Sequence, residues 1–201
     1  MKLYRLVFIS FVALLLASCG LTSPVKLPAV STYTISHSFI SIPNASKTCY
    51  TILMSMPVAA SGYQSSDMIY VQKAYKLKSF ANNRWASPPA EMLLPLMAQR
   101  LRSYGFFKAV VTPPFAGVTN YRLDTQLLVL QQEFLHPTSI VRMVMQATLV
   151  NNTTNRVVAS RRFQVMVTAP DNNPYSGVLA ANKASDIMSK RISTFVIRSV
   201  R

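Results

Sequence analysis

The residues with the clearest potential for chemistry stand near the N-terminus, where Leu16, Ala17 and Ser18 directly precede Cys19. A cysteine thiolate is a strong nucleophile, so its sulfur can accept a lipid group. Small side chains before the cysteine let a peptidase approach the backbone between Ser18 and Cys19. Cys19 is therefore the first candidate in this chain for a chemically modified residue.

The flanking residues support this interpretation. Lys2 and Arg5 form a short positive region, and the run from Leu6 to Ala17 carries no charge. A membrane-spanning helix needs about 20 apolar residues, whereas a run of this length is typical of a signal peptide. Residues 1–18 are therefore expected to be removed. The alternative is an ordinary secretory signal that happens to contain a cysteine.

The end of the signal resembles a bacterial lipobox. The resemblance implies diacylglycerol transfer to the Cys19 sulfur, cleavage after Ser18 and acylation of the new amine. Two or three acyl chains make a durable anchor without a spanning helix. In enterobacterial lipoproteins an Asp after the cysteine favours retention in the inner membrane, and Gly20 is not that signal. We expect attachment to the outer membrane, on its periplasmic face.

Few residues elsewhere could support catalysis. The two histidines, His37 and His136, have no Cys, His or carboxylate neighbour at metal-ligand spacing. The six acidic residues are scattered, with no close pair for acid–base catalysis. No Gly-x-Ser-x-Gly motif and no phosphate-binding loop is present. We expect no enzymatic activity, no cofactor and no metal; a periplasmic enzyme would need polar residues that cluster only in the fold.

Two cysteines remain in the mature chain, Cys19 and Cys49. If Cys19 carries lipid, Cys49 has no partner for a disulfide within the chain. We expect Cys49 to be a small buried residue at the start of a strand. A bridge between two molecules is the alternative.

The charge is strongly unbalanced: 21 basic and six acidic residues give +15, and removal of the signal with Lys2 and Arg5 leaves +13. Such a balance in the cytoplasm would suggest nucleic acid, but secretion excludes that partner. A basic face would instead favour anionic lipid headgroups, lipopolysaccharide or an acidic protein. A generally solvated basic surface explains the charge equally well.

The mature chain of 183 residues is long enough for one domain with a core. Residues 19–34 contain Pro24, Pro28 and small polar residues, and they predict an acylated, extended tether. Residues 35–201 are then a single α+β domain.

The domain alternates strand-like and helical patterns. The predicted strands are 49–56, 68–80, 106–111, 121–135, 140–150 and 156–168. Residues 58–67 are expected to form a loop, and the last three strands an antiparallel meander. Helices are expected over 88–104 and from about residue 174 to the C-terminus. Two amphipathic helices on one face of a mixed, largely antiparallel sheet is the economical packing.

Local signals define the first helix. Ser87 can cap it, Pro88 suits the first helical position, and Gly105 suits a left-handed C-terminal stop. Pro95 should kink or weaken its first half. The methionines are expected to fill the core rather than to line a lipid groove: Met92, Met97, Met143, Met145, Met166 and Met188.

The order of these pieces resembles the ABC-type transport auxiliary lipoprotein component family, which includes paraquat-inducible protein C lipoproteins. The resemblance covers roughly residues 45–198 and the lipobox. It is carried by Tyr70, Arg84–Trp85, Pro88–Pro89, Glu91 to Leu101, Gly105-Phe106-Phe107 leading to Val110–Val111, the stretch YRLDTQLLVLQQEF, RRFQVMVTAP and the final helix.

The resemblance implies a role without chemistry of its own. Family members accompany a periplasmic substrate-binding protein of the mammalian-cell-entry (MCE) type, a permease and an ATPase, which together move lipids between the two membranes or maintain lipid asymmetry. The lipoprotein would dock the periplasmic component to the outer membrane. It could do so as a single copy or as a homo-oligomeric ring. The alternative is a structural or assembly lipoprotein of a secretion or lipopolysaccharide-export complex.

Arg84 and Trp85 allow two interpretations. A lone tryptophan at the start of a helix most often fills the core, with the arginine stacked or capping nearby. Tryptophan and arginine are also enriched in interface hot spots, so the pair could bind a partner.

Overall fold

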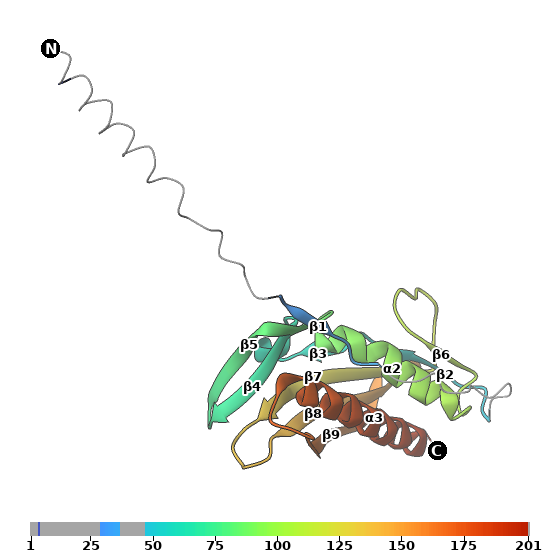
Figure 1. Ribbon diagram of the computed structural model, residues 1–201. Helices are drawn as coiled ribbons and strands as arrows, with labels where there is room; N and C mark the ends of the chain where they lie inside the picture. Colours follow the sequence, from blue (N-terminus) through green and yellow to red (C-terminus); the bar gives the residue numbers. More distant parts are fainter. Residues whose placement is uncertain (1–3, 5–28, 37–46, 201) are drawn as a thin grey trace.

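The computed structural model describes Tyr4, residues 29–36 and residues 47–200 (Figure 1). Outside the described residues lie Ser18, Cys19, Gly20 and His37. Cleavage and lipid attachment therefore stay predictions from sequence. Within the described ranges, no helix combines the length and apolar character that a bilayer crossing requires.

Nine strands of the described chain form one mixed sheet. In chain order they are β1 (Ser31–Tyr33), β2 (Thr51–Met54), β3 (Val58–Ala59), β4 (Asp67–Lys73), β5 (Lys76–Trp85), β6 (Ala109–Val111), β7 (Tyr121–Glu133), β8 (Ile140–Asn151) and β9 (Arg156–Thr168). The long strands β7, β8 and β9 pair antiparallel, which confirms the predicted meander. The free edge of β7 carries β2, β3 and β4 in succession, all parallel to it. Strand β6 then extends β2, and β5 and β1 extend β4.

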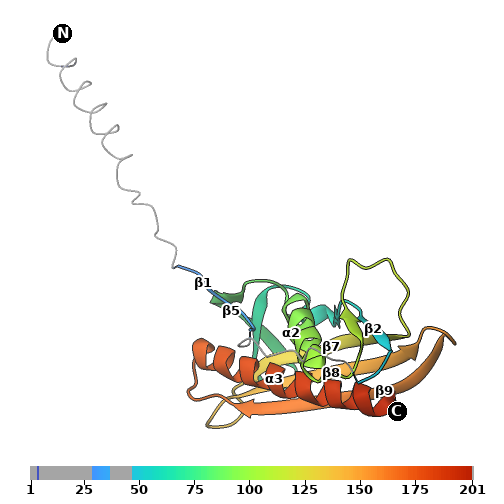
Figure 2. The same cartoon turned by 90° about the vertical axis from the view of Figure 1, so that its right-hand side faces the viewer.

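Two long helices, α2 (Pro89–Ser103) and α3 (Pro174–Ser199), lie on one face of this sheet (Figure 2). The buried side chains of both helices form a single apolar cluster with those of the sheet. An ion pair between Arg100 of α2 and Asp186 of α3 links the helices to each other. The α+β class and the placement of both helices on one face are confirmed.

The residue types at the helix ends explain where the helices begin and stop, with one exception. The Asn173 side chain accepts a hydrogen bond from the Ser176 N–H at 2.8 Å and caps α3. Helix α2 has no side-chain cap, because Pro88 rather than Ser87 occupies the N-cap position; the predicted Ser87 cap is wrong. Helix α2 continues through the exposed Pro95. Gly105 takes φ 57°, as expected for a left-handed stop.

Most of the methionines fill the core as predicted. Met97, Met143, Met145 and Met188 are fully buried between the sheet and the helices. Met166 is half-exposed, because it projects from the opposite face of β9. The prediction is therefore wrong for this position.

The segment from 68 to 80 is not one strand but a hairpin. Strand β4 ends at Lys73, the chain reverses at Ala74 and Tyr75, and β5 returns as far as Trp85. The reversal has neither Gly nor Asn, and Tyr75 itself takes the left-handed φ of 66°. A turn without its usual residues gives no signal in the sequence. The alternating patterns of β4 and β5 therefore look like one continuous strand.

Three further expectations need correction. Cys49 is exposed and forms no disulfide within the described chain. The expected loop 58–67 contains the short strand β3, which pairs with the middle of β7. Residues 31–33, placed in the tether by their composition, form β1 at the edge of the sheet. Short edge strands such as these depend on their neighbours rather than on their own sequence.

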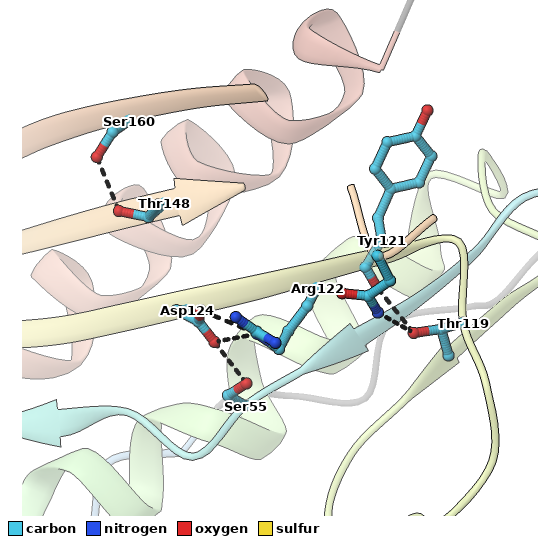
Figure 3. Close-up of polar contacts among 8 residues, drawn as sticks. Ser55, Thr119, Tyr121, Arg122, Asp124, Thr148 and Ser160 are labelled. Carbon is cyan, nitrogen blue, oxygen red and sulfur yellow. Dashed lines mark hydrogen bonds and ion pairs between the residues drawn. The ribbon is translucent and has the colours of Figure 1, made fainter. Parts of the chain in front are cut away.

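The sheet face away from the helices is mostly polar, and Figure 3 shows part of it. The Ser55 hydroxyl donates to Asp124 Oδ1 at 2.7 Å, and Arg122 Nε lies 3.0 Å from both oxygens of the same carboxylate. The hydroxyls of Thr148 and Ser160 lie 2.7 Å apart across β8 and β9. These contacts are at least partly open to solvent. They satisfy the hydrogen-bonding groups of these side chains without a covering layer of apolar residues.

Candidate functional site

A groove with a volume of about 510 Å³ lies between β9 and the C-terminal half of α3. A second hollow of about 400 Å³ shares Arg161, Phe195 and Arg198 with it, so the two form one continuous concave surface. We call this surface the basic groove. Its size is in the range of small-ligand sites in proteins.

Five basic residues line the basic groove: Arg161, Arg162, Lys190, Arg191 and Arg198. The first two lie on β9 and the last three on α3. Because side chains alternate along a strand, the Arg161 side chain faces α3, whereas Arg162 has the parity of Ser160 and Met166, which lie on the other face of the sheet. Residues 191, 194, 195 and 198 are three or four positions apart, so the helical period places them on the same side of α3. Among the described residues that line the groove there is no carboxylate.

Two of the α3 cations are held in place. The Arg191 Nη1 donates a hydrogen bond of 2.7 Å to the Gln164 carbonyl oxygen on β9. Lys190 Nζ lies 3.4 Å from Asp186 Oδ2, one turn earlier on α3. The first contact fixes the width of the groove, because it joins the helix to the strand.

The floor of the groove is aromatic. Phe163 of β9 and Phe195 of α3 meet edge to face, with ring centroids 5.5 Å apart and an interplanar angle of 69°. An apolar floor with cationic walls fits an amphiphilic anion. Arginine binds phosphate with two parallel N–H groups, and a groove of one charge sign raises the local concentration of anions.

The basic groove is lined by cationic, polar and aromatic residues. Its lining holds neither a histidine nor a carboxylate among the described residues. The described part of the chain also contains no group of three or more His, Cys, Asp or Glu side chains placed to hold a metal ion.

A second polar cluster is buried on the opposite face of the sheet, beneath the short 3₁₀ turn Ser61–Tyr63. The Tyr63 hydroxyl donates to Gln131 Oε1 at 2.5 Å, and Gln131 Nε2 donates to Glu133 Oε1 at 2.6 Å. Arg142 Nη2 donates to Glu133 Oε2 at 2.9 Å. Burial raises the pKa of the Tyr63 phenol, and the Glu133 charge raises it further, whereas Arg142 lowers it. Tyr63 therefore remains a donor at neutral pH, and the cluster stabilises the fold.

The sequence candidates lie away from the basic groove. Trp85 is 4% exposed and belongs to the core cluster, while the adjacent Arg84 is exposed at the end of β5. Strand β1 pairs with both residues, Thr32 with Arg84 and Tyr33 with Trp85. His136 is exposed in the turn between β7 and β8.

The sequence reasoning did not predict the basic groove. Its residues come from two segments about 30 positions apart, and each segment alone resembles an ordinary solvated surface. The available signal was the pair Arg161–Arg162 together with Lys190, Arg191 and Arg198 on one helical stripe.

The chain forms a small α+β domain with a basic groove on its surface. A model of the ABC-type transport auxiliary lipoprotein component family matches residues 40–193, and the chain belongs to this family. A comparison with curated proteins gives no significant match.

Solved structures share the fold at low sequence identity. A Xanthomonas campestris protein is 17% identical with a TM-score of 0.76, covering 85% of this chain and 97% of its own. An uncharacterized protein is 12% identical with a TM-score of 0.67, covering 84% and 99%. A hypothetical protein from Chlamydia trachomatis is 9% identical with a TM-score of 0.50, covering 76% and 96%.

Proposed function

We propose that this lipoprotein is a non-catalytic accessory subunit of an MCE-type ABC lipid-transport system, anchored through Cys19 to the periplasmic face of the outer membrane. It docks the periplasmic substrate-binding component, singly or as a ring of copies, while the permease and ATPase remain at the inner membrane. The family assignment supports the transport role. The single structural observation in its favour is the basic groove, whose cationic walls and aromatic floor suit an anionic phospholipid.

Purification of the tagged full-length chain from detergent-solubilised membranes tests the partner. We expect an MCE-type protein to copurify, and we expect loss of the gene to increase detergent sensitivity. Mass spectrometry of the purified chain should find Cys19 at the N-terminus with acyl groups. Recovery of a secretion-channel or lipopolysaccharide-export component in place of an MCE-type protein would instead support the assembly role.

A binding measurement tests the basic groove. We expect Arg161→Ala with Arg198→Ala to weaken binding of short-chain phosphatidylglycerol by about tenfold or more, because each arginine contributes a charge-assisted hydrogen bond. Calorimetry below the micelle concentration measures this. Two control ligands are measured in the same way. Phosphatidylcholine of the same chain length tests whether the headgroup charge is needed, and inorganic phosphate tests whether the acyl chains are needed.

The matched control is Arg84→Ala with Arg156→Ala, which removes two exposed charges outside the groove. An equal loss in both double variants would mean that only net charge matters, and the groove would then not be the site.

A further inference from the structure

The tip of the β4–β5 hairpin, Gln72–Lys78, projects beyond the sheet. Strand β4 pairs with β7 only at Tyr70 and Val71, and beyond them the two hairpin strands pair only with each other. Every side chain from Gln72 to Ser79 is exposed. We propose that this hairpin tip is a membrane contact, which places Tyr75 and Leu77 in the interface of an anionic bilayer.

Tyr75 is held in an unfavourable conformation while being fully exposed. Its φ is 66°, a region in which a bulky residue is a genuine outlier, and its relative exposure is 104%. Gly or Asn would make the same turn at lower cost, by about 1 kcal/mol. The protein therefore holds an aromatic side chain outward at a position where the backbone conformation disfavours it.

The charge of the hairpin tip matches an anionic surface. Lys73, Lys76 and Lys78 lie within six residues, and no acidic residue occurs between Val71 and Trp85. Each lysine near an anionic membrane contributes about 1 kcal/mol to attraction. Lysine can also keep its charge in water while its stem lies along the apolar boundary, and tyrosine is enriched at that depth. Leu77, with 47% exposure, adds apolar surface to the tip, and its Cδ1 lies next to Gly62 of the 3₁₀ turn.

The base of the hairpin is rigid. The rings of Tyr70 and Phe80 stack with centroids 4.4 Å apart, and Phe134 meets both edge to face. Lys78 Nζ lies 5.9 Å from the Tyr70 ring centre and donates to Gln72 Oε1 at 3.1 Å. The Tyr70–Phe80 and Lys78–Gln72 contacts join the two hairpin strands, and Phe134 connects their base to the end of β7.

The direction of β1 relates the hairpin tip to the predicted lipid anchor, which precedes β1 in the sequence. Ser31 pairs with Asn83 and Tyr33 with Trp85 in parallel, so the chain enters β1 from the direction of the tip (Figure 1). Tyr75 lies about 26 Å along β5 from Asn83 at 3.3 Å per residue. The segment from Cys19 to Ser31 can span at most about 40 Å. A membrane that holds Cys19 is therefore within reach of Tyr75.

Reconstitution of the full-length acylated protein into vesicles tests the contact. An environment-sensitive fluorophore is attached at Ala74→Cys in a Cys49→Ser background, which leaves Tyr75 intact. We expect its emission to move to shorter wavelength in phosphatidylglycerol vesicles, to be quenched by lipid-attached spin labels, and to move less in phosphatidylcholine vesicles. A fluorophore at Thr153→Cys, in the exposed β8–β9 turn, should show neither change.

The decisive variant is Tyr75→Asn with Leu77→Ser. Asparagine tolerates the left-handed φ, so the hairpin should fold at least as well, while the shift and the quenching should be lost. Retention of both signals in this variant, or their absence in the parent protein, would overturn the proposal. A fluorescence change that requires added MCE-type protein would also overturn it, because the tip would then contact a protein.

Discussion

Arg142→Leu is expected to destabilise the protein by about 3 kcal/mol, because it leaves a buried carboxylate without its cation. Glu133 is 5% exposed at its side chain, and Arg142 Nε lies 2.8 Å from its Oε1. After the substitution only Gln131 would donate to Glu133 among the contacts described for this carboxylate. We place the loss at the lower end for a broken buried pair, since the Arg142 side chain is itself 34% exposed.

The matched control is Arg122→Leu on the same face of the sheet. Its pair with Asp124 has the same chemistry, but both side chains are about 40% exposed (Figure 3). We expect a loss of less than about 1 kcal/mol. Urea unfolding at neutral pH measures both variants. Similar losses at the two positions would show that burial of Glu133 does not determine the cost.

Gly177→Ala is expected to lower the free energy of unfolding by about 2 kcal/mol, although alanine is the better helix former. A Cβ at this position would overlap the Gln132 side-chain amide. Gln132 is buried and cannot move without loss, because its Nε2 donates to Ser139 Oγ at 2.9 Å and to the Asn173 carbonyl at 3.2 Å. The first bond joins the end of β7 to the β7–β8 connection, and the second joins it to the start of α3.

The double variant Gln132→Ala with Gly177→Ala identifies the cause. If the two side chains collide, the second substitution should be neutral or stabilising once Gln132 is shortened, because the gain in helix propensity remains. Thermal and urea unfolding of the two single variants and the double variant give the coupling energy. Strict additivity would exclude the collision.

The elements that sequence predicts well are those with a long, regular pattern. The three meander strands and both helices carry long runs of buried residues, and their stops, such as Gly105, carry their own residue signals. The prediction failed for elements whose conformation is determined by the surrounding fold rather than by their own sequence. Strand β3 forms because β7 offers an edge, and the turn at Ala74 and Tyr75 lacks the glycine or asparagine that marks a reversal.

The basic groove was harder to predict from the sequence for a related reason. Arg161 and Arg198 lie on different elements, and only the packing of α3 on β9 brings them to one groove. Cys49 shows the converse: its residue type favours burial, yet it precedes the strand on an exposed stretch. The chemistry of Cys19, in contrast, depends on adjacent residues alone, so sequence suffices to predict it.

Helix α3 also acts as a spacer along the length of the domain. Its 26 residues measure about 39 Å at 1.5 Å per residue. Tyr175, near its first turn, lies beside Tyr33 of β1, whereas Lys190 to Arg198 reach the opposite end (Figure 1). If the hairpin tip marks the bilayer surface, the basic groove stands well above it, beyond contact with the leaflet that anchors the protein. Such a groove would meet cargo arriving across the periplasm before it met the lipids underneath.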